Sequence, residues 1–414
     1  MKKGDVDMAD MHVECFDMIN PFVIASSPAT RGADNVIRSS SCKPGAITMR
    51  NFGHGMGGGG FFYPSFDAVL KGQPAFHSHA VGRQLPDTMA NLDQYCEEVR
   101  RARRDMYPET KLWDSVGHYH DIEKYPDWKD RWKREAREVV NAGADAIELH
   151  FNTPGVATAS DRQFNYYQLV STCTKMIKAA VPGTPVMVKL AIEDCDCLTS
   201  IREAVAAGAD AVGPTARWKA FYFDLDYKAT QPRPGSGYGG TQANPLVCFE
   251  IADARKSGIT IPMYAGGGVF SYDQALRYIM AGAEMVQFGA IACSGGIKVC
   301  ERIIKQCSDW MDKNGYASVK ELQGVALELF NMNGDFAKRR QEKLGEAYRL
   351  RDSDPEKCIG CGRCQDVCWY KGIEVKDKKA HKTENCIGCG YCFQVCPTKA
   401  LEVDAAGILK SAWD

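Results

Sequence analysis

Apolar runs of five to seven residues recur along the first 290 residues, and polar or glycine-rich residues follow each of them. Runs of this length that end in turn residues are typical of buried β-strands. Most of them are separated by segments with apolar residues at helical spacing. Eight strands are predicted, at 22–28, 46–51, 111–117, 146–151, 186–191, 211–215, 262–268 and 285–290.

One phrase recurs where a predicted helix gives way to a strand. It occurs as NAGADAIELHF at 141–151, AAGADAVGPT at 206–215 and MAGAEMVQFG at 280–289. Glycine suits the end of a helix, and the apolar run after it suits a buried strand. A repeated helix–turn–strand unit indicates an α/β barrel or a doubly wound sheet. Eight units in this length of chain favour a (β/α)8 TIM barrel.

Active sites of such barrels lie at the C-terminal ends of the strands. Here those ends are polar or glycine-rich: Ser26-Ser27, Arg50-Asn51, His118-Tyr119-His120, His150, Lys189, Thr215, Gly267-Gly268 and Gly289. Glycines after the last two strands suit a phosphate group, or equally a tight strand-to-helix turn. The run GHGMGGGG at 53–60 has no helix pattern after it, which favours a mobile lid over a dinucleotide-binding loop.

Two similar cysteine runs lie near the end of the chain. CIGCGRCQDVC begins at 358, and CIGCGYCFQVC begins 28 residues later. In the spacing C-x2-C-x2-C-x3-C, three cysteines bind one iron–sulfur cluster and the fourth binds the other cluster. Zinc and disulfides fit this duplication poorly. The predicted ligands are Cys358, Cys361, Cys364 and Cys396 for one 4Fe-4S cluster, and Cys386, Cys389, Cys392 and Cys368 for the second.

These runs resemble a bacterial two-cluster ferredoxin, except that Trp369 stands where the pattern usually has proline. A ferredoxin module moves single electrons and does no bond chemistry alone, so the residues before it must use those electrons. We predict a barrel at 1–312, a charged helical connector at 313–352, and a ferredoxin-like domain with a tail at 353–414.

Composition limits the cellular setting. The other ten cysteines are scattered, which is typical of small buried side chains in a cytosolic protein. A net charge of -1, from 51 Lys and Arg against 52 Asp and Glu, gives no case for nucleic acid or an anionic membrane as partner. No signal-peptide h-region and no membrane-length apolar run is visible. We expect a soluble, cytoplasmic protein.

Seven segments, in order, resemble the FMN barrel of the dihydroorotate dehydrogenases. They are NPFVIASSP at 20–28, GAITMR at 45–50, ELHFNTP at 148–154, VMVKL at 186–190, YGGTQANP at 238–245, YAGGGV at 264–269 and VQFGA at 286–290. With its ferredoxin-like tail, the chain resembles the catalytic subunits of bacterial NAD-dependent dihydropyrimidine dehydrogenases. The resemblance implies an oxidoreductase that acts on CH–CH or C=C bonds.

The resemblance also implies where FMN binds. Ala25 and Ser26 match the segment under the isoalloxazine ring, and Lys189 matches the lysine that contacts the flavin and favours its reduced anion. Arg50 replaces a family lysine, which keeps the charge but changes the hydrogen-bond geometry. The phosphate-binding loops correspond to Gly240, Gly267, Gly268, Gly289 and Ala290.

The substrate-contacting positions depart from the family. Thr153 replaces the catalytic cysteine, and a threonine hydroxyl is a poor general acid. His150 replaces a pyrimidine-contacting asparagine, and Ala216-Arg217 replaces an Asn-Thr pair. His79 loosely matches a third asparagine. A site that loses its hydrogen bonds to a substrate discriminates against it. The substrate is therefore predicted not to be a pyrimidine.

Reduced flavin gives a hydride from N5 to an electron-poor C=C bond, and it can exchange single electrons with clusters. The adjacent carbon needs a proton, and His150 is the first candidate donor because imidazole titrates near neutrality. Tyr119, His118 and His120 are further candidates, and a structural role for His150 is the alternative. Arg217 is a candidate for holding an anionic substrate group, or for a surface ion pair.

Three functions remain open. The chain is an ene-reductase or dehydrogenase for a non-pyrimidine substrate, a dihydropyrimidine dehydrogenase with altered contacts, or an electron-transfer subunit of a larger complex. No nicotinamide-binding motif is visible, so the electron donor is expected to be another subunit of the NAD(P)H or FAD type, or a soluble ferredoxin. An oligomer is expected.

Overall fold

Eight parallel strands close into a barrel at the positions that the apolar runs predict, so the predicted (β/α)8 fold is confirmed. The computed structural model describes residues 10–50, 60–64, 75–80, 91–117, 125–151, 165–193, 195–216, 218–220, 236–330, 349–350, 353–386, 389–401 and 403–404. The barrel strands, in chain order, are β1 (Phe22–Ile24), β2 (Ala46–Met49), β5 (Lys111–Val116), β6 (Ala146–His150), β7 (Val186–Ala191), β8 (Ala211–Thr215), β11 (Tyr264–Gly266) and β12 (Met285–Phe288).

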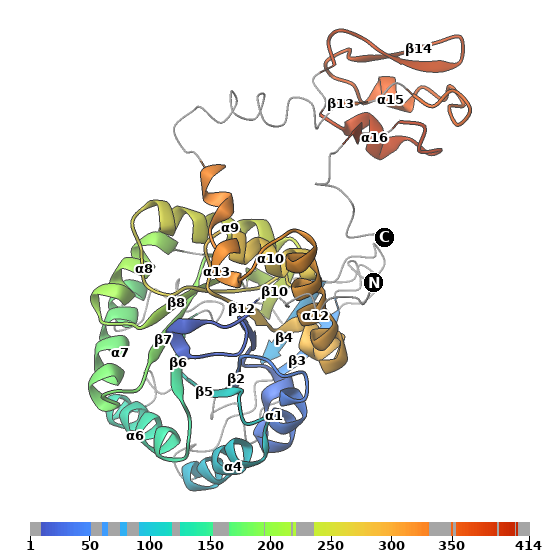
Figure 1. Ribbon diagram of the computed structural model, residues 1–414. Coiled ribbons are helices and arrows are strands. Elements are labelled where there is room, and N and C mark those ends of the chain that lie inside the picture. The colour runs from blue at the N-terminus through green and yellow to red at the C-terminus, as the bar shows by residue number, and fades with distance from the viewer. Residues whose placement is uncertain are drawn as a thin grey trace, which may run out of the picture. The chain divides into compact units, whose positions relative to one another are not determined.

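Helices form a ring outside these strands, as Figure 1 shows. They are α1 (Gly32–Ser40), α4 (Leu92–Asp105), α6 (Trp128–Asn141), α7 (Tyr166–Ala180), α8 (Cys197–Ala206), α9 (Ala243–Lys256), α10 (Tyr272–Met280), α11 (Ala290–Ser294) and α12 (Ile297–Lys313). Short helical segments precede or follow them: η1 (Glu14–Phe16), η2 (Pro28–Thr30), α13 (Val319–Leu322) and η4 (Val325–Glu328). Because helices cover its outer wall, the barrel sheet buries both faces, which explains its continuous apolar runs.

The recurring phrase has a structural reason. In each copy, glycine takes a positive φ just after the helix, at Gly143, Gly208 and Gly282. The acidic residue two positions later accepts a hydrogen bond from a backbone N–H at or near the start of the neighbouring barrel strand. The pairs are Asp145 with Leu112 at 2.7 Å, Asp210 with Val186 at 2.6 Å, and Glu284 with Met263 at 2.6 Å. Each phrase therefore ends a helix and joins the next strand to the sheet.

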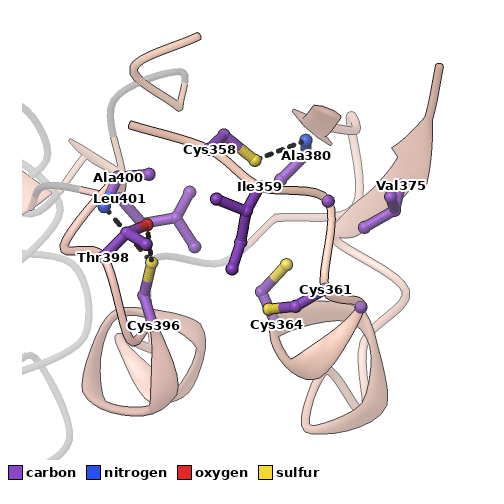
Figure 2. Close-up of a pocket in the computed structure, with 12 residues that line it drawn as sticks. Cys358, Ile359, Cys361, Cys364, Val375, Ala380, Cys396, Thr398, Ala400 and Leu401 are labelled. Carbon is purple, nitrogen blue, oxygen red and sulfur yellow. Dashed lines mark hydrogen bonds between the residues drawn. The ribbon is translucent and has the colours of Figure 1, made fainter. Parts of the chain in front are cut away.

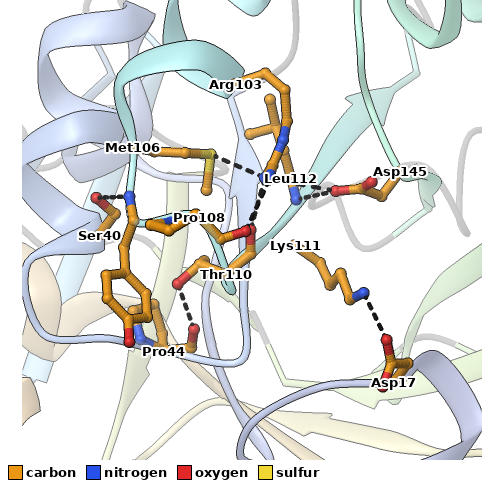
Figure 3. Close-up of polar contacts among 11 residues, drawn as sticks. Asp17, Ser40, Pro44, Arg103, Met106, Pro108, Thr110, Lys111, Leu112 and Asp145 are labelled. Atoms are coloured by element: carbon orange, nitrogen blue, oxygen red, sulfur yellow. Dashed lines mark hydrogen bonds and ion pairs between the residues drawn. The ribbon is translucent and has the colours of Figure 1, made fainter.

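Side chains from α4 and its following loop fix the same end of the barrel (Figure 3). Arg103 donates to the carbonyl oxygens of Thr110 at 2.7 Å and Pro108 at 2.9 Å. The Thr110 hydroxyl donates to the Pro44 carbonyl at 2.7 Å, just before β2. These bonds satisfy loop carbonyls and set the N-terminal edge of the sheet.

A second sheet grows from two loops that follow barrel strands. β3 (Gly60–Pro64) and β4 (Ala75–Ala80) follow β2, while β9 (Trp218–Ala220) and β10 (Ser236–Gly240) follow β8. They pair antiparallel in the order β3-β4-β10-β9. Both loops leave the C-terminal ends of their strands, which is the end of a barrel that holds active sites. The apolar pattern did not predict this sheet.

The chain divides into two compact units, Met1–Glu328 and Leu329–Asp414. The second unit contains the hairpin of β14 (Ile373–Lys376) and β15 (Lys379–Lys382), the short pair β13 (Arg349–Leu350) and β16 (Val403–Asp404), and the helices α15 (Arg363–Asp366) and α16 (Tyr391–Val395). Across the described residues of both units, every helix is too short or too polar to span a bilayer.

Candidate functional site

His150 lies at the C-terminal end of β6, where the strand register pairs it with Lys189 of β7. Its Nδ1 atom is 3.2 Å from Oγ of Ser115, a buried residue on the neighbouring strand β5. Gly117 makes room for the ring, because a Cβ atom there would lie 2.8 Å from Nδ1 and Cε1 of His150. The imidazole is thus held at one nitrogen by a hydroxyl that can donate or accept.

Lys189 is only 8% exposed, and its ammonium lies in the barrel interior. Its Nζ donates to Oε1 of Gln287 at 2.6 Å, and Nε2 of Gln287 donates to Oε2 of Glu148 at 2.5 Å. The other carboxylate oxygen of Glu148, Oε1, is 3.7 Å from Nζ of Lys189. An amide therefore bridges a buried ion pair across strands β6, β7 and β12. Such a pair is tolerated because each charge has a partner.

Tyr264 of β11 fills the barrel next to this ion pair. Its ring occupies the space that a side chain at Gly213 would need, since a Cβ atom there would lie 2.2 Å from the ring. Trp113 packs edge-on against it, with ring centroids 6.5 Å apart. The Tyr264 hydroxyl interacts with the Glu148 carboxylate. Burial, and then the negative charge of Glu148, raises the pKa of Tyr264 well above its ordinary value.

Arg50 follows β2, and its backbone is held on both sides. Its N–H donates to the Thr30 carbonyl at 3.1 Å, and its own carbonyl oxygen is 2.9 Å from the Tyr95 hydroxyl. The same hydroxyl is 2.8 Å from Oδ2 of Asp114, on the outer face of β5. One hydroxyl proton cannot serve both acceptors, whereas a protonated Asp114 could donate to Tyr95. Burial accordingly raises the pKa of Asp114 well above its ordinary value.

Gly240, which ends β10, meets the glycines that follow β11 beside the start of α9. A Cβ atom on Gly268 would lie 2.7 Å from the Gly240 carbonyl oxygen and 2.8 Å from the backbone nitrogen of Asn244. Gly267 and Gly268 have φ values of 103° and 69°, which side chains other than hydrogen disfavour. Bare backbone therefore meets the N-terminal end of a 14-residue helix, an arrangement that suits a phosphate group.

The remaining cofactor candidates lie on the neighbouring strands β12 and β1. Gly289 follows β12, and a Cβ atom there would lie 3.9 Å from the Cβ of Ala25. The backbone N–H of Ala25 donates to the Phe288 carbonyl at 3.0 Å. Ser26 comes directly after Ala25, and Ala290 begins α11. These residues share the C-terminal end of the barrel with Lys189 and His150.

Three predicted catalytic residues, Tyr119, Thr153 and Arg217, lie outside the described residues, as do His118 and His120. Sequence reasoning missed Ser115, Glu148, Gln287 and Tyr264. A signal for two of them was present, because Glu148 and Gln287 are single polar residues inside the apolar runs AIELHF and MVQFGA. A polar residue in a fully buried strand requires a partner, and here the two are partners of each other.

In the second unit, Cys358, Cys361, Cys364 and Cys396 line one cavity together with Ile359 and Thr398 (Figure 2). These are the four cysteines predicted to share a cluster. In the described part of the chain, no three His, Cys, Asp or Glu side chains are placed to hold a single metal ion. Four cysteines at one cavity match the number of ligands that a cubane cluster needs, one at each iron corner.

Backbone amides point at the cysteine sulfurs. Ala380 N–H donates to Sγ of Cys358 at 3.4 Å, and Ala400 N–H donates to Sγ of Cys396 at 3.2 Å. Burial alone would raise the pKa of Cys396, but amides of Ala400 and Leu401 and the contact with Thr398 outweigh it and lower the pKa. A lowered pKa favours the thiolate, which is the form that binds iron.

The second predicted ligand set is described less completely, because residues 387 and 388 fall outside the described chain. Gly372 N–H donates to Sγ of Cys368 at 3.1 Å. A Cβ atom on Gly372 would lie 2.6 Å from Cα of Cys386, so the last cysteine of the first run approaches the start of the second. Burial raises the pKa of Cys392 to about 11. Trp369, in the place of the usual proline, is 85% exposed.

Two family models match the chain. Residues 92–311 match dihydroorotate dehydrogenase, and residues 352–397 match a 4Fe-4S dicluster domain. Among curated proteins, the NAD-dependent dihydropyrimidine dehydrogenase subunit PreA of Escherichia coli K12 is 24% identical over 374 residues, which is 86% of this chain and 84% of that protein.

Catalytic subunits of dihydroorotate dehydrogenase B (NAD(+)) also match. The subunit of Thermoplasma acidophilum is 27% identical over 253 residues, covering 60% of this chain and 77% of its own length. That of Pyrococcus abyssi is 29% identical over 197 residues, covering 46% and 64%. These relatives are dehydrogenases, and the family typically binds FMN. Because the dihydroorotate dehydrogenase model spans more than half of the chain, this protein belongs to that family, as an oxidoreductase with an added 4Fe-4S dicluster domain.

Proposed function

We propose that this protein reduces, or in reverse forms, an activated C=C bond in a substrate that is not a pyrimidine. FMN supplies hydride transfer at N5, and two 4Fe-4S clusters supply single-electron transfer between the flavin and an external donor. The residues of this chain have the remaining tasks: to hold the cofactors, to orient the substrate and to deliver a proton.

The FMN site is supported by the backbone around Gly240, Gly267 and Gly268. The positive φ angles of Gly267 and Gly268, beside the start of α9, leave backbone without side chains where a phosphate group would bind. Lys189 supplies a buried positive charge in the same end of the barrel. Ala25, Ser26, Gly289 and Ala290 would complete the site, on adjacent strands, and Arg50 would add a second cation nearby.

The observation that best supports the chemistry is the position of His150. It lies at a strand end beside Lys189, and Ser115 fixes one of its nitrogens. A histidine held in this way can transfer a proton from its other nitrogen near neutral pH. We therefore infer that His150 is the general acid, with Tyr119 as the next candidate.

The proposal of a different substrate rests on three departures from the family. His150 stands in place of an asparagine, Thr153 in place of the catalytic cysteine, and Arg217 within the replaced Asn-Thr pair. Each lost hydrogen bond in a buried site costs about 1–3 kcal/mol. Two or three losses correspond to roughly two to six orders of magnitude in affinity. Arg217 would instead hold a negative group of the new substrate.

Dihydropyrimidine dehydrogenase activity is the second candidate, favoured by the match that covers 84% of the Escherichia coli subunit. The relatives are named as a "subunit" and a "catalytic subunit", which supports a partner that delivers electrons. We propose that this partner is a subunit of the NAD(P)H or FAD type, or a soluble ferredoxin. A non-catalytic electron-transfer role is the third candidate.

The test is to reduce the anaerobically purified protein and to follow flavin reoxidation as candidate acceptors are added. Uracil and thymine should reoxidise the flavin slowly, whereas an unsaturated acid or activated ring should do so fast. Rapid reoxidation by uracil would establish the second candidate instead. Reoxidation by no small acceptor, but only by a protein partner, would favour the electron-transfer role.

His150→Asn should keep its flavin and slow turnover by about 10²–10⁴, the usual size of a general-acid contribution. His12→Asn is the matched control, because His12 bonds Asp17 before the first barrel strand. Full activity of the His150 variant would mean that another residue is the general acid, and it would leave the proposal of an altered substrate specificity intact.

A further inference from the structure

The barrel interior contains a carboxylate that the proposed chemistry does not yet use. Glu148 is fully buried, and Gln287 is 1% exposed. A hydrogen bond of 2.5 Å joins Gln287 to Glu148, and the oxygen of the same Gln287 amide accepts a hydrogen bond of 2.6 Å from Lys189. Three side chains from β6, β7 and β12 therefore form one connected chain of polar groups.

The amide bridge has an electrostatic consequence. Gln287 is neutral, so it fixes the positions of the two charged groups without cancelling either charge. Oε1 of Glu148 is 3.7 Å from Nζ of Lys189, and the Tyr264 hydroxyl is a further polar group beside the carboxylate. Because Glu148 is fully buried, water does not screen its negative charge, and the field of that charge acts strongly on its surroundings.

We propose that Glu148 sets the reduction potential of the flavin, acting through Lys189 and Gln287 as a positioning and charge-balancing residue. This inference rests on the proposed function, in which FMN lies against Lys189. The reduced flavin is an anion that the ammonium of Lys189 favours. The carboxylate of Glu148, beside that ammonium, repels the negative charge of the reduced flavin. Glu148 therefore holds the reduction potential of the flavin lower than Lys189 alone would.

Glu148→Gln tests this idea because it removes the charge and keeps the shape. At a fixed solution potential, the ratio of reduced to oxidised flavin should rise about tenfold, as expected for loss of one nearby buried charge. For a two-electron couple this is an upward shift of about 30 mV. The measurement is equilibrium reduction of the flavin against reference dyes, which does not depend on turnover.

Two further variants separate charge from packing. Glu148→Asp keeps the charge in the same strand and should stay within about threefold of the parent ratio. Glu148→Ala removes the same charge without adding an amide and should also raise the ratio about tenfold. It reports on the same field if Glu148→Gln fails to fold. Glu284→Gln is the matched control: its carboxylate is also largely buried and paired, with Arg255 at 2.6 Å, but it precedes β12 at the other end of the barrel.

The inference is overturned if Glu148→Gln changes the potential no more than Glu284→Gln, or if Glu148→Asp shifts it as far as Glu148→Gln. A parent protein without flavin would instead overturn the proposed function and this inference together. If Lys189→Ala weakens FMN binding while Glu148→Gln leaves the potential unchanged, the proposed site stands and only the role of Glu148 fails.

Discussion

If His150 is the general acid, as proposed, its contact with the Ser115 hydroxyl determines which of its nitrogens exchanges a proton. The contact is made at Nδ1, so the tautomer that keeps a proton on Nδ1 and donates it to Ser115 leaves the exchange to Nε2. Ser115 is 1% exposed and comes from a different strand, so the contact is not an accident of a mobile surface group. A positioning role for Ser115 can be tested separately from the acid role of His150.

Ser115→Ala should slow turnover about 3–10-fold, because one neutral hydrogen bond contributes about 0.5–1.5 kcal/mol. Ser115→Thr retains the hydroxyl and should recover most of that loss. Flavin reoxidation measures the rate, and ¹⁵N chemical shifts of the imidazole, assigned with His150→Asn, report the tautomer. A normal rate together with an altered tautomer in Ser115→Ala would exclude the positioning role.

At the scale of elements, the two faces of strand β5 have different roles. Ser115 and Trp113 share the face that contacts the barrel interior, while Asp114 faces Tyr95 on α4. This alternation is the ordinary period of a strand. It explains how a carboxyl group so close to the site along the chain takes part in helix packing instead.

Asp114 should make stability fall as pH rises. Its pKa is raised on folding from 3.8, so above pH 4 the folded state holds a proton that the unfolded state has lost. Unfolding free energy then decreases with pH, by up to about 1.4 kcal/mol per pH unit, until the raised pKa is passed. Asp114→Asn should flatten this decline, as measured by denaturant unfolding at several pH values.

The control for that experiment is Asp130→Asn on α6. The pKa of Asp130 is lowered by its contact with Lys133, so its effect on stability has the opposite sign. An unchanged pH slope in Asp114→Asn would mean that another carboxyl, such as Glu284, whose pKa burial also raises, accounts for the titration.

The barrel could be predicted from sequence because buried strands and glycine-ended helices leave strong local signals. The sheet of β3, β4, β9 and β10 could not, since GFFYP, AFHSHA, WKA and SGYGG are short and lack a clear alternation, and AFHSHA and SGYGG are rich in histidine or glycine. The Lys189–Glu148 ion pair and its bridge through Gln287 could not be predicted from the sequence either. Glu148 and Gln287 are 139 residues apart, and no local pattern indicates which strands face each other.

For the whole molecule, the two units differ in what holds them together. The first has a continuous apolar core that runs through all eight barrel strands. Among the described residues of the second, the buried cluster consists of Ile373, Ala380, Leu401 and two predicted ligands, Cys364 and Cys392, with other, partly buried cysteines around them. So small a core supplies little stability without an added crosslink or metal.

Removal of the clusters should therefore unfold the second unit and spare the barrel. Intact protein should contain about eight irons and eight sulfides, as expected for two clusters. After oxidation and chelation, calorimetry should lose the transition of the second unit and keep that of the first, because ligation energy is folding energy in small metal domains. A second unit that melts cooperatively without iron would contradict this.

The amide bridge between Lys189 and Glu148 has a last consequence, for the order in which the molecule folds. Gln287 is 98 residues from Lys189 and 139 from Glu148. Contacts between such distant residues form slowly, because a long loop must close first. A nascent barrel that has not yet received β12 contains both charges but not the group that joins them. The barrel therefore closes and completes its charge network in the same folding step. An intermediate stalled before β12 is added would be unable to assemble the site around Lys189.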